Sequence, residues 1–262
     1  MEFIDGDFFE ELSKKKNIFY CETHEISKHI DTIDNEIILT HNSDSCLEYI
    51  GNDQLKLSLT LTLWSDNAQK KFGSRYKIIN IPKHIKKWYG QNLIGNGDKR
   101  FVALPIGLER RRWSNGYKHK ILLQKFKEEN KKKGTLIYLN FKEKNHESRK
   151  NLISSLNIPN SKIVRNKINF TEYCSDIEKS KFVLSPTGNG YDCHRTWESL
   201  YLGSVPIIKS NNYYDELYSN LPVLLVFDYA LITEKLLNEK YLELSIKFTN
   251  KTTTEYWENL IN

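Results

Sequence analysis

The amino-acid sequence predicts an α/β fold arranged as two small domains. The first observation is the run from residue 182 to residue 208, in which a strand, a glycine loop, a helix and a second strand follow one another as a βαβ unit. The second is the alternation of strand-like and helix-like segments through the C-terminal half, which is typical of a doubly wound parallel sheet. A chain of 262 residues, 39% of them hydrophobic, is long enough for two such domains.

The N-terminal half is predicted to be a small α/β layer. Short apolar runs and one alternation of leucines predict strands at residues 18–21, 36–40, 55–64, 78–81 and 101–104. Pro82 is placed to begin a helix that carries Ile85 and Trp88. The strand over residues 36–40 leads into the polar turn His41-Asn42-Ser43-Asp44, and sites of α/β proteins form at such a carboxyl edge of a sheet.

The boundary between the two domains is predicted after residue 133. A helix over residues 118–132 stops at Gly134, and a strong strand over residues 135–141 follows. The inner face of this helix is expected to hold Ile121, Leu122, Leu123 and Phe126. We therefore expect a first domain of residues 1–133 and a second of residues 134–250.

The second domain is expected to continue with alternating elements. These are a strand at residues 162–165, a helix through Tyr173 and Ile177, the βαβ unit, a strand at residues 222–228, and helices at residues 234–248 and 253–261. The terminal segment, residues 251–262, is expected to pack back on the N-terminal domain.

The glycine loop and the helix after it form a candidate anion site. Gly188 and Gly190 relax the steric limits on the backbone after the strand, Asp192 is suited to cap the helix, and Gly203 is placed to end it. Unpaired N–H groups at a helix N-terminus favour a phosphate. His194 and Glu198 share one helix face and Arg195 lies beside it, so ionisable side chains are expected to line a polar cleft.

These residues carry a family resemblance. The pattern Ser185-Pro186-x-Gly188-Asn189-Gly190, then Asp192-x-His194-Arg195-x-Trp197-Glu198, then Leu202-Gly203-x-x-Pro206-Ile207, resembles the signature of exostosin-like glycosyltransferases and their bacterial and viral relatives. A weaker likeness lies upstream, at residues 40–44, 91–92 and 104–107. The resemblance implies a GT-B-like architecture, in which two small Rossmann-like domains face each other across a cleft and the second holds the nucleotide-sugar donor.

The resemblance also implies roles for individual residues. Gly188, Asn189 and Gly190 would line the donor diphosphate, His194 and Arg195 would approach the phosphates or the sugar, and Glu198 would bind ribose hydroxyls. Arg149, in the polar stretch after the strand at residues 135–141, would reach a donor phosphate. Ser185, Thr187 and Asp192 complete the expected donor site, although relatives often carry a basic residue where this chain has Thr187.

The predicted activity is transfer of a sugar from a nucleoside-diphosphate sugar to a hydroxyl of a glycan or a lipid-linked acceptor, as in polysaccharide biosynthesis. No cofactor is expected. A metal is not required, because a helix N-terminus and Arg195 can take up the charge of the departing diphosphate and the sequence has no Asp-x-Asp motif. If the anomeric centre inverts, His41 or Asp44 is the candidate base.

Three other functions stay open. A catalytically silent sugar-nucleotide or glycan-binding module would use the same residues. A hydrolase would use Ser185, His194 and Asp192, but no Gly-x-Ser-x-Gly elbow exposes Ser185. A metal site at His194 and Glu198 lacks a visible third ligand.

Charge and composition limit the partners and the cellular compartment that we expect. The net charge of +6 is gathered in basic blocks at residues 14–16, 86–87, 110–112 and 131–133, which attract a nucleotide, an anionic glycan or an anionic membrane surface. Nucleic acid is not expected, since the aromatic residues do not interleave with these blocks. The four cysteines lack metal-ligand spacing, which favours a cytoplasmic protein with free thiols. The sequence has no apolar run of about 18 residues, the length that a membrane span needs. With the basic blocks, this predicts peripheral contact at the inner membrane face.

Overall fold

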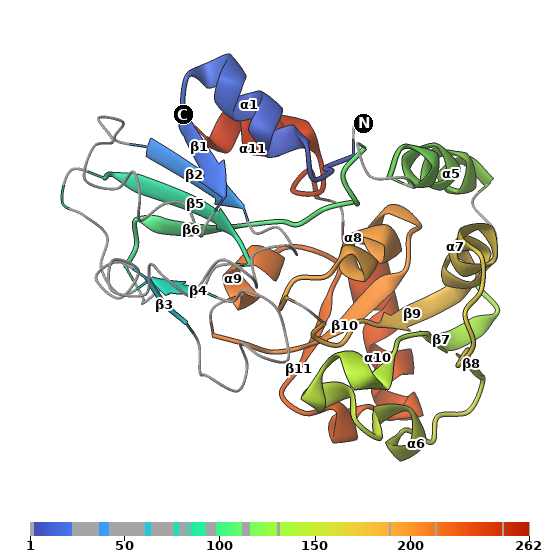
Figure 1. Ribbon diagram of the computed structural model, residues 1–262. Helices are drawn as coiled ribbons and strands as arrows, with labels where there is room; N and C mark the ends of the chain where they lie inside the picture. Colours follow the sequence, from blue (N-terminus) through green and yellow to red (C-terminus); the bar gives the residue numbers. More distant parts are fainter. Residues whose placement is uncertain are drawn as a thin grey trace. The chain divides into compact units, whose positions relative to one another are not determined.

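The computed structural model describes residues 3–22, 37–41, 61–63, 76–78, 83, 85–92, 98–111, 116–129, 132–188, 190–212, 214–247 and 249–261. They divide into two compact units. One comprises Asp7–Pro105 with Gly188–Asp192, and the other comprises Met1–Gly6, Ile106–Thr187 and Cys193–Asn262. Each unit is built on its own parallel sheet (Figure 1), which confirms the α/β class. The boundary after residue 133 and the GT-B arrangement stay predictions.

The larger unit contains a five-stranded, wholly parallel sheet of order β11-β10-β9-β7-β8. Its strands are β7 (Thr135–Leu139), β8 (Ser161–Ile163), β9 (Ser180–Leu184), β10 (Val205–Lys209) and β11 (Leu224–Val226). In chain order the strands run 2-1-3-4-5 across the sheet, which is one of the two common doubly wound orders. The strand order therefore reverses between β7 and β9, and this switch point locates the expected ligand crevice.

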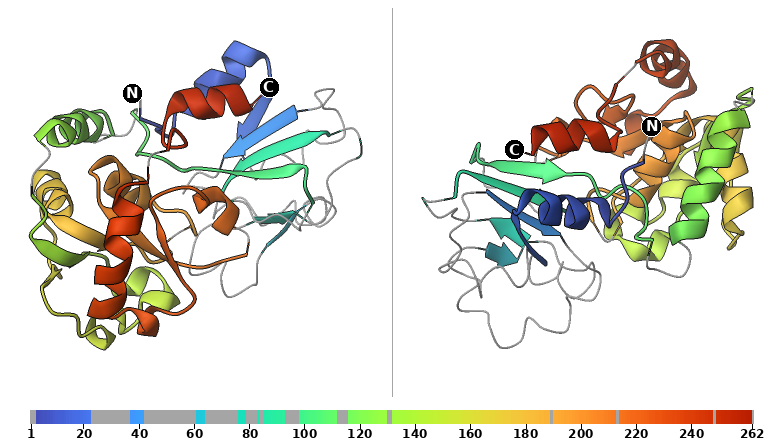
Figure 2. Two further views of the ribbon diagram at one scale, coloured as in Figure 1. Left: turned by 180° about the vertical axis from the view of Figure 1, so that it is seen from behind. Right: turned by 90° about the horizontal axis from the view of Figure 1, so that it is seen from above.

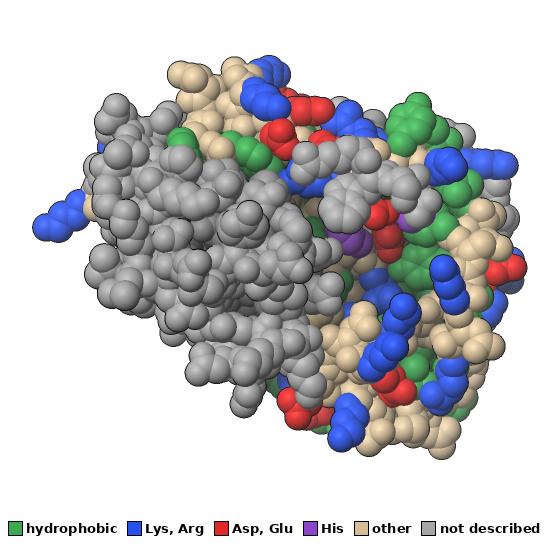
Figure 3. All heavy atoms as spheres, in the orientation of Figure 1, with side chains coloured by type: hydrophobic (Ala, Val, Ile, Leu, Met, Phe, Trp, Pro, Cys, Tyr) green, Lys and Arg blue, Asp and Glu red, His purple; other side chains and the backbone are tan. Residues whose placement is uncertain are grey.

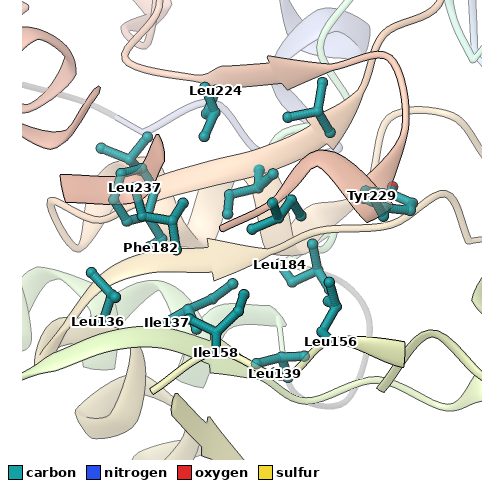
Figure 4. Close-up of a cluster of buried hydrophobic side chains, with 14 of the residues drawn as sticks. Leu136, Ile137, Leu139, Leu156, Ile158, Phe182, Leu184, Leu224, Tyr229 and Leu237 are labelled. Atoms are coloured by element: carbon teal, nitrogen blue, oxygen red, sulfur yellow. The ribbon is translucent and has the colours of Figure 1, made fainter. Parts of the chain in front are cut away.

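One face of this sheet buries the main apolar core. Ile137, Phe182 and Val205 form one row across β7, β9 and β10, and Leu184 and Ile207 continue the same face one step along. Their side chains pack with residues of α6 (Leu152–Ser155) and α10 (Glu234–Ser245), as Figure 4 shows for Leu237. The view from behind in Figure 2 shows α10 crossing in front of the sheet.

The opposite face is covered by helices that also carry the candidate site. Side chains along a strand point alternately to the two faces, so residues such as Tyr138, Val183 and Ile208 lie on this face. The helices leave them fully or almost fully buried. α7 (Phe170–Glu178) packs on β9, α8 (His194–Tyr201) packs on β10, and α5 (Gly116–Glu129) packs on both helices. The remaining elements of this unit are η3 (Glu143–Asn145), η4 (Glu147–Arg149), α9 (Asp215–Tyr218), η5 (Tyr229–Leu231) and α11 (Thr254–Leu260).

The two ends of the chain meet at α8. Phe3 forms an antiparallel bridge with Thr253, and its ring stacks on Tyr201 of α8 with centroids 4.3 Å apart. The Tyr201 hydroxyl accepts a hydrogen bond from the backbone N–H of Ile4 at 3.0 Å and donates one to the carbonyl of Thr252 at 3.1 Å. One buried side chain thus fixes both terminal segments to the helix that carries the candidate site.

The smaller unit contains a four-stranded parallel sheet of order β1-β2-β5-β6 and a two-stranded antiparallel sheet. Its elements are α1 (Phe8–Lys16), β1 (Phe19–Glu22), β2 (Ile37–His41), β3 (Leu61–Leu63), β4 (Tyr76–Ile78), β5 (Lys87–Gln91) and β6 (Phe101–Leu104). The predicted strands at residues 18–21, 36–40 and 101–104 are confirmed as β1, β2 and β6. Of the predicted strands at residues 55–64 and 78–81, only residues 61–63 and 78 are described, and they lie in β3 and β4.

Three local predictions are wrong. Trp88 lies in β5 instead of a helix, because its aromatic side chain is fully buried in a strand that pairs with both β2 and β6. Asp192 does not cap α8, since Cys193 occupies the N-cap position and makes no side-chain capping bond. Ile121 is 48% exposed, so the inner face of α5 is narrower than predicted. Gly203 does follow the end of α8 with a positive φ of 69°, as predicted.

Candidate functional site

The candidate site lies in the larger unit, where two loops leave the carboxyl ends of β7 and β9. The loop after β7 leads through η3 and η4 to Arg149, and the loop after β9 begins with Ser185, Pro186 and Thr187. Because the strand order reverses between these two strands, their loops diverge and leave a crevice at the sheet edge. The predicted residues Arg149 and Thr187 are thus brought together from opposite sides of the switch point.

Arg149 joins the two loops through its guanidinium group. Its Nε donates to the carbonyl of Thr187 at 2.8 Å, and Nη2 donates to the carbonyl of Pro186 at 2.8 Å. Its charge lies 5.6 Å from the centroid of the Phe141 ring, and the residue is only 5% exposed. Burial lowers the pKa of Arg149, and the nearby positive charge of Arg195 contributes in the same direction. Among the described residues no carboxylate forms an ion pair with Arg149, so its charge is available to an anion.

Ser185 connects the end of β9 to α8. Its hydroxyl shares a 2.9 Å hydrogen bond with the hydroxyl of Thr196, and Ser185 is 1% exposed. A serine nucleophile needs a general base such as histidine within hydrogen-bond reach, and a threonine hydroxyl is not one. The structure therefore gives the hydrolase alternative no support, and Ser185 serves to position the first turn of α8.

The glycine loop is shaped by Asn92 of the same compact unit. The side chain of Asn92 accepts from the Asp192 backbone N–H at 2.9 Å and donates to the Asp192 carbonyl at 3.1 Å. A Cβ on Gly190 would come within 2.4 Å of this side chain, so only glycine fits. The backbone N–H of Gly188 donates to the carbonyl of Gly190 at 3.0 Å.

Two of the amides that the sequence analysis assigned to the diphosphate, at residues 188 and 192, are thus already hydrogen-bonded within the protein. Asn189 lies outside the described residues. The open polar groups begin with α8, where the backbone N–H groups of His194 and Arg195 form no hydrogen bond with any described residue.

His194 is held by one ring nitrogen. Nδ1 lies 2.7 Å from the carbonyl oxygen of Gly107, and because a carbonyl can only accept, Nδ1 carries a proton. Nε2 is therefore the nitrogen with a free lone pair when the ring is neutral. Gly107 has a φ of 64°, and a Cβ there would lie 2.5 Å from the carbonyl oxygen of Ile4, so this close approach also requires glycine.

Among the described residues, none is an ion-pair partner for the charge of Arg195. Its Nε is buried and forms no hydrogen bond, and its side chain takes part in no ion pair with any residue that the structure describes. An ordinary surface pair between Arg195 and Glu198, which the spacing permits, is not formed. Buried donors without acceptors are uncommon in folded proteins and often mark the place of a ligand.

Glu198 is 9% exposed and accepts a 2.7 Å hydrogen bond from the hydroxyl of Tyr173 on α7. Burial and the neighbouring Glu198 charge raise the pKa of Tyr173 well above its usual value, so the hydroxyl stays protonated and keeps donating. The bond engages Oε2, whereas Oε1 accepts from no described residue. One carboxylate oxygen is thus available to a hydroxyl group of a ligand.

These side chains line one open hollow of about 410 Å³ in the larger unit. Its lining consists of Glu109, His119, Arg149, Phe170, Tyr173, Cys193, His194, Arg195 and Glu198. Figure 3 shows histidine and acidic side chains meeting in a hollowed part of the surface. The volume and the mixture of cations, a carboxylate and aromatic rings suit a small polar ligand that carries both negative charge and hydroxyl groups.

Glu109, His119 and Phe170 were missed by the sequence analysis, and Tyr173 was assigned only to a helix. No local motif marks them, because they reach the hollow from three separate segments. His119 Nδ1 lies 3.4 Å from Glu109 Oε2, and the His119 ring stacks on Phe170 with centroids 3.5 Å apart.

Two further predictions concern residues of the smaller unit and the metal alternative. His41 ends β2, but its side chain lies outside the described part of the structure, as does Asp44. Within the described ranges, no three metal-ligating side chains gather at one place, so His194 and Glu198 gain no third ligand. No described helix is both long and apolar enough to cross a bilayer.

Part of the chain matches a known protein family. Residues 129–257 match the family model described as the RXYLT1 C-terminal domain, a xylosyltransferase-related, exostosin-like domain. The matched stretch includes Arg149, the glycine loop and α8, and it supports a glycosyltransferase-related function at the coarse level. No curated protein matches the chain.

Proposed function

We propose that this protein is a glycosyltransferase that moves a sugar from a nucleoside-diphosphate sugar to a hydroxyl of a glycan or lipid-linked acceptor. The observation that carries the proposal is the meeting of Arg149 and Arg195, both without a carboxylate partner among the described residues, in the hollow at the switch point of the sheet. Two uncompensated guanidinium groups in a partly buried site favour a ligand with two negative charges.

The donor diphosphate lies against Arg195, the part of Arg149 that lines the hollow and the first turn of α8. Arg195 supplies the stronger contact, because its Nε is a buried donor without an acceptor among the described residues. The free N–H groups at the start of α8 and the positive end of the helix dipole add to it. As the bond between sugar and phosphate breaks, these groups stabilise the charge on the leaving diphosphate, so that transfer proceeds without a metal ion.

The ribose of the donor lies near Glu198. Oε1 of Glu198 is free to accept a ribose hydroxyl, while the Tyr173 hydroxyl holds the carboxylate in place through Oε2. Phe170 and His119, stacked on each other beside this carboxylate, form the adjoining wall. In the proposed GT-B arrangement the smaller unit presents the acceptor, and exclusion of water protects the donor from hydrolysis.

A catalytically silent sugar-nucleotide or glycan-binding module is the second candidate. The observation that favours it is the buried Glu198–Tyr173 hydrogen bond, which gives Glu198 a structural role as well. Both candidates bind a nucleoside diphosphate in the same hollow. They differ in whether the bond between sugar and phosphate is broken.

Thermal unfolding with UDP and GDP tests the donor site. Either nucleotide is expected to raise the melting temperature, because a ligand that binds only the folded state stabilises it. Arg195→Ala should remove the shift, and Glu198→Gln, which keeps an acceptor for Tyr173, should reduce it. Arg165→Ala is the matched control, since this arginine is 58% exposed and lies outside the hollow. A melting temperature that no nucleotide changes would contradict the proposal.

Release of free nucleoside diphosphate from a panel of UDP- and GDP-sugars separates the two candidates. A transferase releases the diphosphate from at least one donor, with water as a slow acceptor, and a silent module releases none. Release is expected to persist in EDTA. Loss of release on chelation, restored by added Mg²⁺ or Mn²⁺, would contradict the metal-independent mechanism.

A cytoplasmic location with peripheral contact to an anionic membrane is part of the same proposal. The basic blocks support the membrane contact only in part, because some of their lysine and arginine side chains contact other parts of the protein. Lys133 donates to the carbonyl of Glu178 at 2.7 Å and to the hydroxyl of Ser204 at 3.0 Å, and Arg111 lies 3.3 Å from Asp5. Sedimentation with vesicles of anionic and of neutral lipids tests the contact, and equal binding to both would contradict it.

A further inference from the structure

A second histidine lies in the hollow beside a carboxylate. His119 comes from α5, and Glu109 comes from the segment that follows β6. His119 Nδ1 lies 3.4 Å from Glu109 Oε2, and both side chains line the hollow together with Arg195 and Glu198. A carboxylate beside Nδ1 favours the tautomer with the proton on that nitrogen, which leaves the lone pair on Nε2.

The ring of His119 is held in one plane. It stacks on Phe170, the first residue of α7, with centroids 3.5 Å apart and planes inclined by only 14°. The Phe170 ring in turn contacts Tyr173, which binds Glu198. The imidazole is thus positioned relative to the carboxylate proposed to hold the donor ribose. A rigid histidine with a carboxylate on one nitrogen and a lone pair on the other has the arrangement of a general base.

Among the described residues, three titratable groups act electrostatically on this imidazole. Glu109, from the segment after β6, and Glu198, from α8, favour its protonated form, and His194, also from α8, disfavours it. α7 contributes the uncharged ring of Phe170. Burial outweighs the two carboxylates and lowers the pKa of His119 below its ordinary value of 6.5. The imidazole is therefore neutral at neutral pH, which a proton acceptor requires.

We propose that His119 accepts the proton of the attacking hydroxyl, with Glu109 stabilising the imidazolium that forms. The inference rests on the proposed glycosyltransferase function. In this step the hydroxyl oxygen forms a bond to the anomeric carbon and its O–H bond breaks, with the proton passing to His119 Nε2. The bond between the anomeric carbon and the phosphate oxygen breaks at the same time, and its electron pair leaves with the diphosphate. The anomeric configuration inverts.

His194 is the less suitable base for this step, although its Nε2 also carries a free lone pair. Its Nδ1 contacts a neutral carbonyl, that of Gly107, whereas His119 has a carboxylate. A carboxylate stabilises the imidazolium produced by proton transfer, and a carbonyl does so less. His194 also begins α8, where the positive end of the helix dipole disfavours a second positive charge.

Two substitutions of His119 test the role. His119→Phe keeps a ring to stack on Phe170 but has no lone pair, and His119→Ala leaves space for a free imidazole molecule. Both are expected to slow nucleoside diphosphate release from the best donor of the panel by about 100-fold or more. Both should retain the melting-temperature shift with UDP or GDP. Imidazole in solution should restore part of the rate of His119→Ala and none of that of His119→Phe.

The pH profile separates a proton acceptor from a structural histidine. In the wild-type protein kcat/KM should fall as the pH is lowered through the pKa of His119, below 6.5. Glu109→Gln removes a charge that favours the imidazolium, so this acid limb should move to lower pH while the rate above it decreases. The limb should be absent in His119→Phe.

The outcomes distinguish this inference from the function on which it rests. If the wild-type protein binds no nucleotide and releases no diphosphate, the proposed function fails and the inference falls with it. If the wild-type protein is active, the inference alone is overturned by any of three results. These are His119→Phe activity within about twofold of wild type, product that retains the anomeric configuration, or loss of the acid limb in His41→Ala or Asp44→Ala instead.

Discussion

The glycine loop and the first turns of α8 are adjacent in sequence but differ in how their polar groups are used. In the loop, the amides at residues 188 and 192 are hydrogen-bonded to protein acceptors, and Arg149, Asn92 and Ser185 hold the loop and its ends. In α8, Arg195 and one oxygen of Glu198 have no partner among the described residues. The loop is therefore a support, and the helix presents the groups that are available to a ligand.

Removing Arg149 should produce the largest loss of stability. Arg149→Ala leaves the buried carbonyl of Pro186 and the partly buried carbonyl of Thr187 without donors, at a cost of about 3 kcal/mol in the free energy of unfolding measured with urea. Arg149→Lys keeps the charge but not the paired donors, and it should lose less. Equal stability of wild type and Arg149→Ala would show that the loop does not depend on the hydrogen bonds from Arg149.

Adding a methyl group at residue 190 should produce the second-largest loss of stability. The added Cβ of Gly190→Ala meets the side chain of Asn92, so the free energy of unfolding should fall by about 1–3 kcal/mol and the loop should shift. Gly134→Ala is the control, since nothing lies within 4 Å of a Cβ built at that glycine. The interpretation of Gly190 would be wrong if both substitutions had the same effect.

Loss of the Ser185 hydroxyl should have a smaller effect. Ser185→Ala removes the hydrogen bond to Thr196 that joins β9 to α8, and the expected destabilisation is about 1 kcal/mol. As a control, Ser154→Ala removes a hydroxyl on an exposed helix and should change little. Because Ser185 is a positioning residue here, Ser185→Ala should keep most of its diphosphate-release activity, whereas an enzyme with a serine nucleophile would lose it.

Removing Arg195 should change stability least and ligand binding most. Its charge forms no ion pair with the residues that the structure describes. Arg195→Ala should therefore alter the free energy of unfolding by no more than about 0.5 kcal/mol while abolishing the nucleotide-induced rise in melting temperature. This pattern is the reverse of that expected for Arg149→Ala. A strongly destabilised Arg195→Ala protein would remove the distinction between the supporting loop and the open helix.

Strands such as β1, β2, β6, β7 and β9 could be predicted, because each is a short apolar run bounded by polar or glycine residues. The helix assigned after Pro82 failed because Trp88 suits either a helix or a strand, and only pairing with β2 and β6 decides between them. Capping by Asp192 failed for a similar reason. Its backbone is held by Asn92, one hundred residues away in the sequence, so the helix begins one residue later.

The sequence was sufficient to predict the α/β class and the βαβ unit with its glycine loop, and Arg149, His194, Arg195 and Glu198, which it marked as donor-site candidates, line one hollow. The βαβ unit depends on local patterns, where local conformation dominates, whereas the choice of Arg149 came from the family resemblance. The tertiary structure alone showed that the loop amides are occupied, that Tyr173 holds Glu198, and that Glu109 and His119 enter the hollow. Those contacts join segments far apart along the chain, and no local pattern encodes which distant side chain will supply a hydrogen bond or a charge.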